Sequence, residues 1–118
     1  GAFYRCTELT TIDLSDTRVV SVGGLAFYEC TKLVELHFSS QMFTAENNAS
    51  IDTQAFKGCA GLNAIYLPDD AVAIPKNCTD DAFQNCPTNG TIYYSGSESG
   101  LANDFKAKFG GLNGWSVS

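Results

Sequence analysis

The sequence lacks several features that would place the protein in common functional classes. Its uninterrupted apolar stretches are only a few residues long, whereas a helix that crosses a bilayer needs about 20. We therefore expect no membrane insertion of this segment. Basic residues are also scarce, because seven Lys and Arg stand against thirteen Asp and Glu and the formal net charge is −6. This excess of negative charge repels phosphate backbones and argues against nucleic acid as a partner.

Catalytic and metal-binding patterns are missing as well. The five cysteines contain no C-x-x-C spacing, and the single histidine, His37, has no second histidine to form an H-x-x-x-H pattern. There is no glycine-rich phosphate loop and no nucleophile elbow. The acidic pairs Asp69-Asp70 and Asp80-Asp81 lack the regular spacing of a calcium loop, so we interpret them as solvated turn residues. We expect neither an enzyme nor a bound metal or cofactor.

What the sequence does contain is an internal repeat. The pattern A-F-x-x-C occurs four times, beginning at Ala2, Ala26, Ala55 and Ala82, so the steps are 24, 29 and 27 residues. The sixth position after each cysteine is always apolar and is occupied by Ile12, Leu36, Ile65 and Ile92. The eighth position is occupied by Leu14, Phe38, Leu67 and Tyr94. Apolar residues two apart are typical of a short strand with one buried face, so we expect one strand in each repeat.

Units of this length cannot bury a core alone, so they must stack into a solenoid. The A-F-x-x-C segments are then turns or short helices whose Phe and Cys side chains point into the stack. A further apolar series, four residues before each later alanine, consists of Val22, Ile51 and Cys78, with Ile74 as an alternative to Cys78. The longest repeat contains the polar segment 39–50, which we expect to form a loop with Met42 and Phe43 exposed.

The repeat pattern stops after Tyr94 and is followed by a helical pattern. A Ser- and Gly-rich turn leads to a stripe at i, i+4 and i+8 that consists of Leu101, Phe105 and Phe109. We expect Ser97 or Ser99 to cap this helix and Gly110-Gly111 to end it. Trp115 lies beyond the glycines, where it can hold the helix over the last core layer.

Together these residues give a pattern that resembles a known family. The pattern A-F-x-x-C-x-x-L-x-x-I-x-L, with Leu67-Pro68 closing one strand, is similar to the BspA-type leucine-rich repeat over residues 2–95. Departures are Asn89, which replaces a leucine, and the segment 77–80. The resemblance implies an α/β solenoid of the leucine-rich-repeat (BspA-like) class, a right-handed stack with one short strand per repeat and a C-terminal helical cap.

The resemblance also suggests a domain organisation and a function. We expect residues 1–95 to be leucine-rich repeats, the C-terminal part of a longer array, and residues 96–118 to be a capping helix and tail. Family members are mostly bacterial and some protist cell-surface proteins, which implies a cell-surface or secreted module that binds or adheres without catalysis. Its ligand would be a protein or glycan, for example on a host surface or matrix. A structural spacer and an intracellular protein-interaction scaffold remain open as alternatives.

The exposed face of the predicted sheet supplies the candidate binding residues. Alignment on the cysteines places Asp13, His37, Tyr66 and Tyr93 in one row across neighbouring strands. The flanking rows are Thr11, Glu35, Ala64 and Thr91 on one side and Ser15, Ser39, Pro68 and Ser95 on the other. We select Asp13, Glu35, His37, Tyr66 and Tyr93 as partner-binding candidates, because exposed tyrosines beside acidic groups are typical of interfaces. The alternative is that Thr and Tyr occupy exposed strand positions for their β-propensity alone.

The cysteines are expected to be structural. Cys6, Cys30, Cys59 and Cys86 each occupy the same repeat position, which predicts a buried ladder of reduced thiols rather than disulfides. Cys78 lies outside this register, and we expect it to be exposed or paired.

Overall fold

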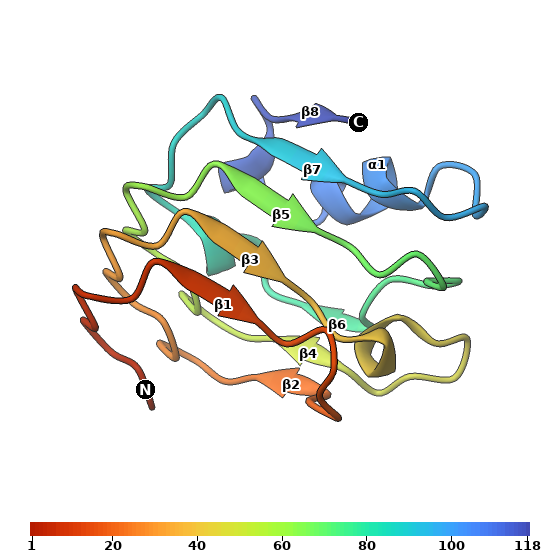
Figure 1. The fold of residues 1–118 in the computed structure, drawn as a ribbon, viewed down its shortest axis with the longest axis horizontal. Helices are drawn as coiled ribbons and strands as arrows, with labels where there is room; N and C mark the ends of the chain where they lie inside the picture. Colours follow the sequence, from red (N-terminus) through yellow and green to blue (C-terminus); the bar gives the residue numbers. More distant parts are fainter.

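The computed structural model describes residues 1–118 as a stack of coils with a parallel sheet on each of two sides (Figure 1). The first sheet contains, in spatial order, β1 (Thr11–Asp13), β3 (Glu35–His37), β5 (Ala64–Tyr66), β7 (Thr91–Tyr93) and β8 (Ser116–Val117). The second sheet contains β2 (Ser21–Val22), β4 (Ser50–Ile51) and β6 (Asn77–Cys78). A continuous hydrophobic core lies between the two sheets. The predicted repeating stack of parallel strands is therefore present.

The expectation of one strand per repeat is wrong, because each of the first three coils carries a second strand. These second strands are only two residues long, so they leave no alternating pattern in the sequence. Their register pairs Val22 with Ile51 and Ile51 with Cys78. Cys78, and not Ile74, therefore continues the apolar series.

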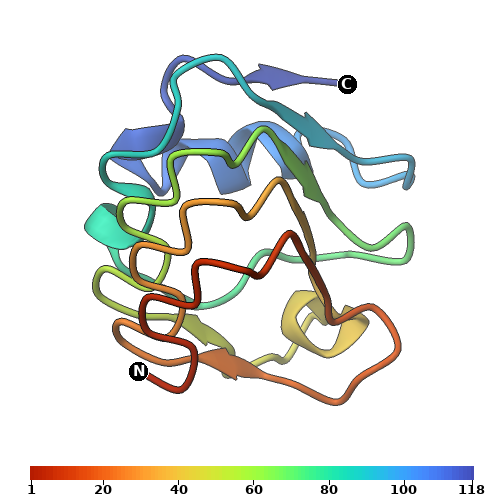
Figure 2. The same ribbon diagram turned by 60° about the vertical axis from the view of Figure 1, so that its left-hand side comes forward.

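The first three A-F-x-x-C segments form tight turns, and the fourth begins in the 3₁₀ helix η2 (Asp80–Phe83); all four stack on one side of the molecule (left in Figure 2). The residue before each cysteine has a left-handed backbone, with φ of 57° at Arg5, 53° at Glu29, 75° at Gly58 and 62° at Asn85. This conformation directs backbone N–H groups toward the next coil. The Glu29 amide, for example, donates to the Lys57 carbonyl at 2.7 Å, and the Gly58 amide donates to the Gln84 carbonyl at 2.9 Å. The turns thus add a hydrogen-bond ladder to those of the two sheets.

Phenylalanine rings form a second ladder inside these turns. Phe3, Phe27, Phe56 and Phe83 stack in sequence with centroid separations of 5.2, 5.2 and 5.0 Å. Phe109 ends the series with an edge-on contact at 4.9 Å to Phe83. The predicted burial of the repeat phenylalanines is confirmed for the three inner copies.

Each inner cysteine links its coil to the preceding one. The Sγ atoms of Cys30, Cys59 and Cys86 donate to the carbonyl oxygens of Phe3, Phe27 and Phe56 at 3.2, 3.1 and 3.2 Å, respectively. All five cysteines are free. Burial raises the pKa of Cys86 to about 12 and also raises that of Cys59. Cys78 is half-buried rather than exposed or paired, and burial raises its pKa to about 11.

The 39–50 segment is less exposed than its polar composition predicts. Its residues Ser40–Phe43 form a 3₁₀ helix, η1, and both Met42 and Phe43 are fully buried. Phe43 lies 6.0 Å from the ring of Phe38 and 5.9 Å from that of Phe105. The expectation that Met42 and Phe43 are exposed is therefore wrong, because Phe105, more than 60 residues further along the chain, supplies an aromatic partner that the local sequence does not reveal.

The C-terminal segment covers the end of the stack. Helix α1 (Leu101–Ala107) buries Leu101 and Phe105, and the following Phe109 is also buried, as the helical stripe predicts. The cap differs from the expectation, since Gly100 occupies the N-cap position and neither Ser97 nor Ser99 caps the helix. Gly110-Gly111 lies beyond the end of the helix, in the 3₁₀ helix η3 (Gly110–Leu112).

A strand that the sequence pattern did not indicate completes the cap. After η3 the chain returns to the first sheet as β8, where Thr91 pairs with Ser116 and Ile92 with Val117. The indole of Trp115 is buried, and its Nε1 donates to the Pro87 carbonyl at 2.7 Å. A Cβ atom on Gly90 would lie within 2.6 Å of the indole ring, so the close packing of Trp115 requires glycine there.

Replacement of Phe56 by alanine should lower the free energy of unfolding by about 3 to 5 kcal/mol, because a fully buried ring is lost from between two others. Chemical denaturation of the purified variant measures this loss. Phe3→Ala is the matched control, since Phe3 is 46% exposed and stacks on one side only. An unchanged midpoint for Phe56→Ala would contradict the ladder.

The three buried thiols should react readily only after unfolding. In denatured, unreduced protein a disulfide-exchange reagent should detect at least four of the five cysteines. In the native protein at about pH 8, Cys30, Cys59 and Cys86 should react slowly, because they are buried and their pKa values are raised. Detection of two disulfides would instead place the protein in a disulfide-stabilised class.

Candidate binding surface on the first sheet

The candidate residues form a continuous row on the outer face of the first sheet. The strand register places Asp13 beside His37, His37 beside Tyr66, and Tyr66 beside Tyr93. Each of these residues is the seventh after the cysteine of its repeat, so the turn and strand have the same length in every coil. The predicted alignment is therefore confirmed.

The aromatic members of this row stack directly on one another. The rings of His37 and Tyr66 are 4.3 Å apart with an interplanar angle of 3°, and those of Tyr66 and Tyr93 are 4.6 Å apart with an angle of 12°. These separations are close to the spacing of neighbouring strands, so the backbone holds the rings in contact. We call His37, Tyr66 and Tyr93 the aromatic row. Tyr93 is 38% exposed, and the other two are partly exposed.

Carboxylates border the aromatic row. The Glu35 Oε1 atom lies 3.2 Å from His37 Nε2. Asp13 accepts hydrogen bonds from the hydroxyl of Ser15 at 2.5 Å and from its amide at 2.9 Å. Both bonds lower the pKa of Asp13, the hydroxyl bond more than the amide bond, and they keep the carboxylate charged. Desolvation of the Tyr66 hydroxyl raises its pKa, and the nearby negative charge of Glu35 raises it further. The Tyr66 hydroxyl therefore stays protonated.

Two residues of the flanking rows are not exposed as predicted. Ala64 is buried, because its small methyl group lies between Glu35 and Thr91 in register. Ser39 is also buried, and its hydroxyl donates to the Val19 carbonyl at 2.6 Å. The chain enters η1 directly after Ser39, so the alternation of the strand no longer applies there.

A hollow of about 400 Å³ adjoins the aromatic row where the strands end. It is lined by Ser15, His37, Ser40, Tyr66, Leu67, Pro68, Asp69 and Asp70. Both aspartates are exposed, and Asp70 accepts a hydrogen bond from the Ser40 hydroxyl at 2.8 Å. Asp69 and Asp70 were not among the candidates from the sequence. Their position directly after the Leu67-Pro68 strand end is the signal that could have identified them.

Comparison with known proteins identifies the repeat. A family model described as a BspA type leucine rich repeat region (6 copies) matches residues 43–103, which is just over half of the chain. The chain belongs to the BspA-type leucine-rich repeat family. Leucine-rich repeats are generally non-enzymatic modules for protein interaction. Searches of curated proteins and of solved structures found no match.

No helix of this BspA-type repeat protein has the length and hydrophobicity needed to cross a bilayer.

The variable part of each coil lies between its first and second strands, on one side of the stack (right in Figure 2). Insertions are concentrated there, whereas the path from the second strand to the next A-F-x-x-C turn keeps a constant length.

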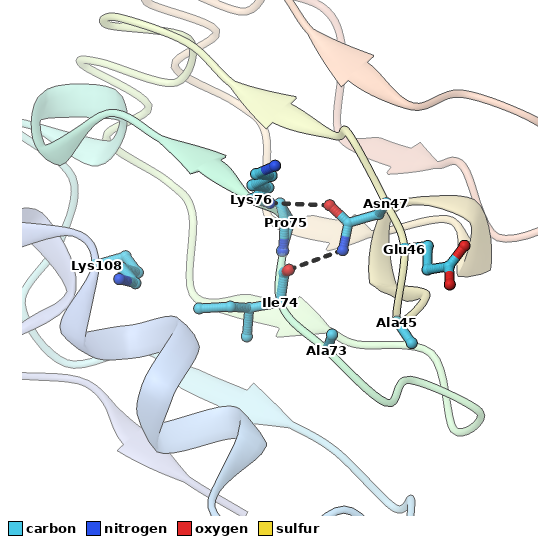
Figure 3. Close-up of a pocket in the computed structure, with 8 residues that line it drawn as sticks. All are labelled: Ala45, Glu46, Asn47, Ala73, Ile74, Pro75, Lys76 and Lys108. Atoms are coloured by element: carbon cyan, nitrogen blue, oxygen red, sulfur yellow. Dashed lines mark hydrogen bonds between the residues drawn. The ribbon is translucent and has the colours of Figure 1, made fainter.

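Two of these variable segments enclose a larger hollow of about 510 Å³ (Figure 3). It is lined by Ala45, Glu46, Asn47, Ala73, Ile74, Pro75, Lys76 and Lys108. The Asn47 amide joins the two segments, since it donates to the carbonyls of Thr44 and Ile74 and accepts from the amides of Ala49 and Lys76. The bonds with Ile74 and Lys76 cross between the segments, and the bonds with Thr44 and Ala49 hold the Asn47 amide in place within its own segment. The hollow contains no aromatic side chain, so the first sheet is the stronger candidate surface.

The aromatic row should contribute less to stability than the core beneath it. Tyr93→Ala should lower the free energy of unfolding by about 0.5 to 1.5 kcal/mol, the value of one aromatic contact. Its neighbour Ile92 is fully buried, so Ile92→Ala should cost about 2 to 5 kcal/mol. Equal losses in denaturation experiments would mean that Tyr93 belongs to the core and is not available to a partner.

Proposed function

We propose that this chain is a non-catalytic binding module, secreted or displayed at the cell surface, that recognises a partner through the outer face of its first sheet. The aromatic row is the observation that carries this proposal. Three rings are held in contact by the strand register, so they lose little conformational freedom when a partner binds. Aromatic anchors of this kind contribute much of the energy of protein interfaces.

Two further features favour binding over a spacer role. A spacer requires only β-propensity at each exposed position, and no relation between neighbouring side chains. Here the rings stack across three strands, and a hollow lined by His37, Tyr66 and two aspartates adjoins them. Membership of a repeat family that generally mediates protein interaction supports the same reading.

The arrangement of the polar groups supports binding rather than catalysis. His37 contacts Glu35 and stacks on Tyr66, while the Ser15 hydroxyl donates to Asp13. These side chains lie side by side on the sheet and do not converge on one point where a substrate atom could react. A protein is the partner class that we favour, and a glycan is the alternative.

Replacement of both tyrosines should weaken partner capture. The wild-type chain, the Tyr66→Ala/Tyr93→Ala variant and the Thr11→Ala control should be immobilised at equal density and exposed to extracts of host surface and matrix proteins. Because binding energy concentrates in aromatic anchors, the double variant should bind its main partner roughly tenfold more weakly or worse. Thr11→Ala should bind like wild type, since Thr11 is exposed on β1 outside the row.

The result that would overturn the proposal is specific. If a captured partner binds with undiminished affinity after His37, Tyr66 and Tyr93 are all replaced, the row is ordinary strand surface. The cellular location is tested separately by antibody labelling of intact cells that express the natural protein. Labelling that requires permeabilised cells would favour the intracellular scaffold.

A further inference from the structure

The charge on the outer face of the first sheet is entirely acidic. The strands of this sheet contain Asp13 and Glu35 but no Lys or Arg, although the chain has seven such residues. Asp69 and Asp70 add two exposed carboxylates in the adjoining hollow. We call these four carboxylates together with the aromatic row the acidic aromatic surface.

No Lys or Arg neutralises these carboxylates. The ion pair of the structure joins Arg5 to Glu29, away from this face, and Glu35 is hydrogen-bonded to the His37 ring. Asp13 and Asp70 contact serine hydroxyls, which orient a carboxylate but do not cancel its charge. The surface therefore presents a concentrated negative potential that attracts cations.

The outer ring face of Tyr93 has no aromatic neighbour, and Tyr93 is 38% exposed. Tyr93 stacks on Tyr66 on one side only, and the strand on its other side, β8, contributes no aromatic residue. In register the residue beyond Tyr93 is Ser118, whose amide donates to the Ile92 carbonyl at 2.9 Å. A guanidinium or ammonium group placed over this outer ring face gains a cation–π interaction.

We propose, on the basis of the function proposed above, that the acidic aromatic surface binds a segment of a partner protein rich in arginine and lysine. An arginine stacks on the outer face of Tyr93, and further cations pair with Glu35, Asp69 and Asp70. From Asp13 to Tyr93 the acidic aromatic surface crosses three strand spacings, or about 14 Å, which an extended segment of four or five residues spans. Arginine is preferred to lysine because its planar guanidinium can stack and bind a carboxylate at the same time.

The test is the binding of labelled nonapeptides to the whole chain, measured by fluorescence anisotropy. The peptides carry three arginines, three lysines or three glutamates in the same Gly-Ser background. We expect the arginine peptide to bind several-fold more tightly than the lysine peptide and the glutamate peptide not to bind. An increase in salt from about 50 to about 200 mM should weaken the binding, because exposed charges are screened.

Matched variants separate this surface from the general charge of the protein. Asp69→Asn/Asp70→Asn should weaken the arginine peptide about tenfold. Glu46→Gln/Asp104→Asn removes the same charge from exposed positions elsewhere and should change the affinity less than about twofold. Tyr93→Ala should abolish the preference for arginine over lysine while it leaves the salt dependence intact.

Three outcomes would overturn the inference. The first is equal weakening by both pairs of carboxylate changes, which would mean diffuse attraction to the net charge. The second is no binding of the arginine peptide. The third is tight binding of a neutral glycan that is insensitive to salt.

The result also distinguishes this inference from the proposed function. If a captured partner depends on Tyr66 and Tyr93 but the arginine peptide neither binds nor competes with it, the sheet face binds a partner and only its cationic nature is wrong. If neither the partner nor the peptide responds to the tyrosine changes, both proposals fail.

Discussion

Successive coils align residue for residue, without any shift in register, and the rest of this structure depends on this alignment. Strands β1, β3, β5 and β7 each begin the same number of residues after the cysteine of their repeat, so identical repeat positions lie directly beside one another. Backbone hydrogen bonds of the turns, cysteine thiols and stacked phenylalanines all reinforce the same alignment. A change of one residue in this path would move every side chain of a strand to the opposite face.

The same constraint explains where irregularity is tolerated. Insertions occur between the first and second strands, where they do not alter the register of either sheet. The 39–50 insertion is nevertheless used by the fold, because it brings Phe43 against Phe38 and Phe105. A variable loop thereby joins the repeats to the capping helix. At the end of the stack β8 pairs with β7, and the buried Trp115 donates to the Pro87 carbonyl of the last coil.

The candidate binding surface follows from register and charge together. Register places the rings of three separate coils in contact, which no single repeat could achieve. Such a preorganised row reduces the entropy that a partner must overcome. The acidic residues around it arise from the strands and from the turn after β5, so the chemical character of the surface depends on residues far apart in the sequence.

The sequence alone determined the repeat, its family, the strands β1, β3, β5 and β7 of the first sheet and the row of Asp13, His37, Tyr66 and Tyr93. It could do so because a constant spacing from each cysteine is a property of the chain itself. The tertiary structure decided the second sheet, strand β8, the burial of Met42 and Phe43 and the place of Asp69 and Asp70 beside the aromatic row. Two-residue strands carry no readable period, and the burial of the inserted segment depends in part on Phe105, which lies far along the chain in α1. Contacts between coils, rather than local propensity, therefore completed the core and the candidate site.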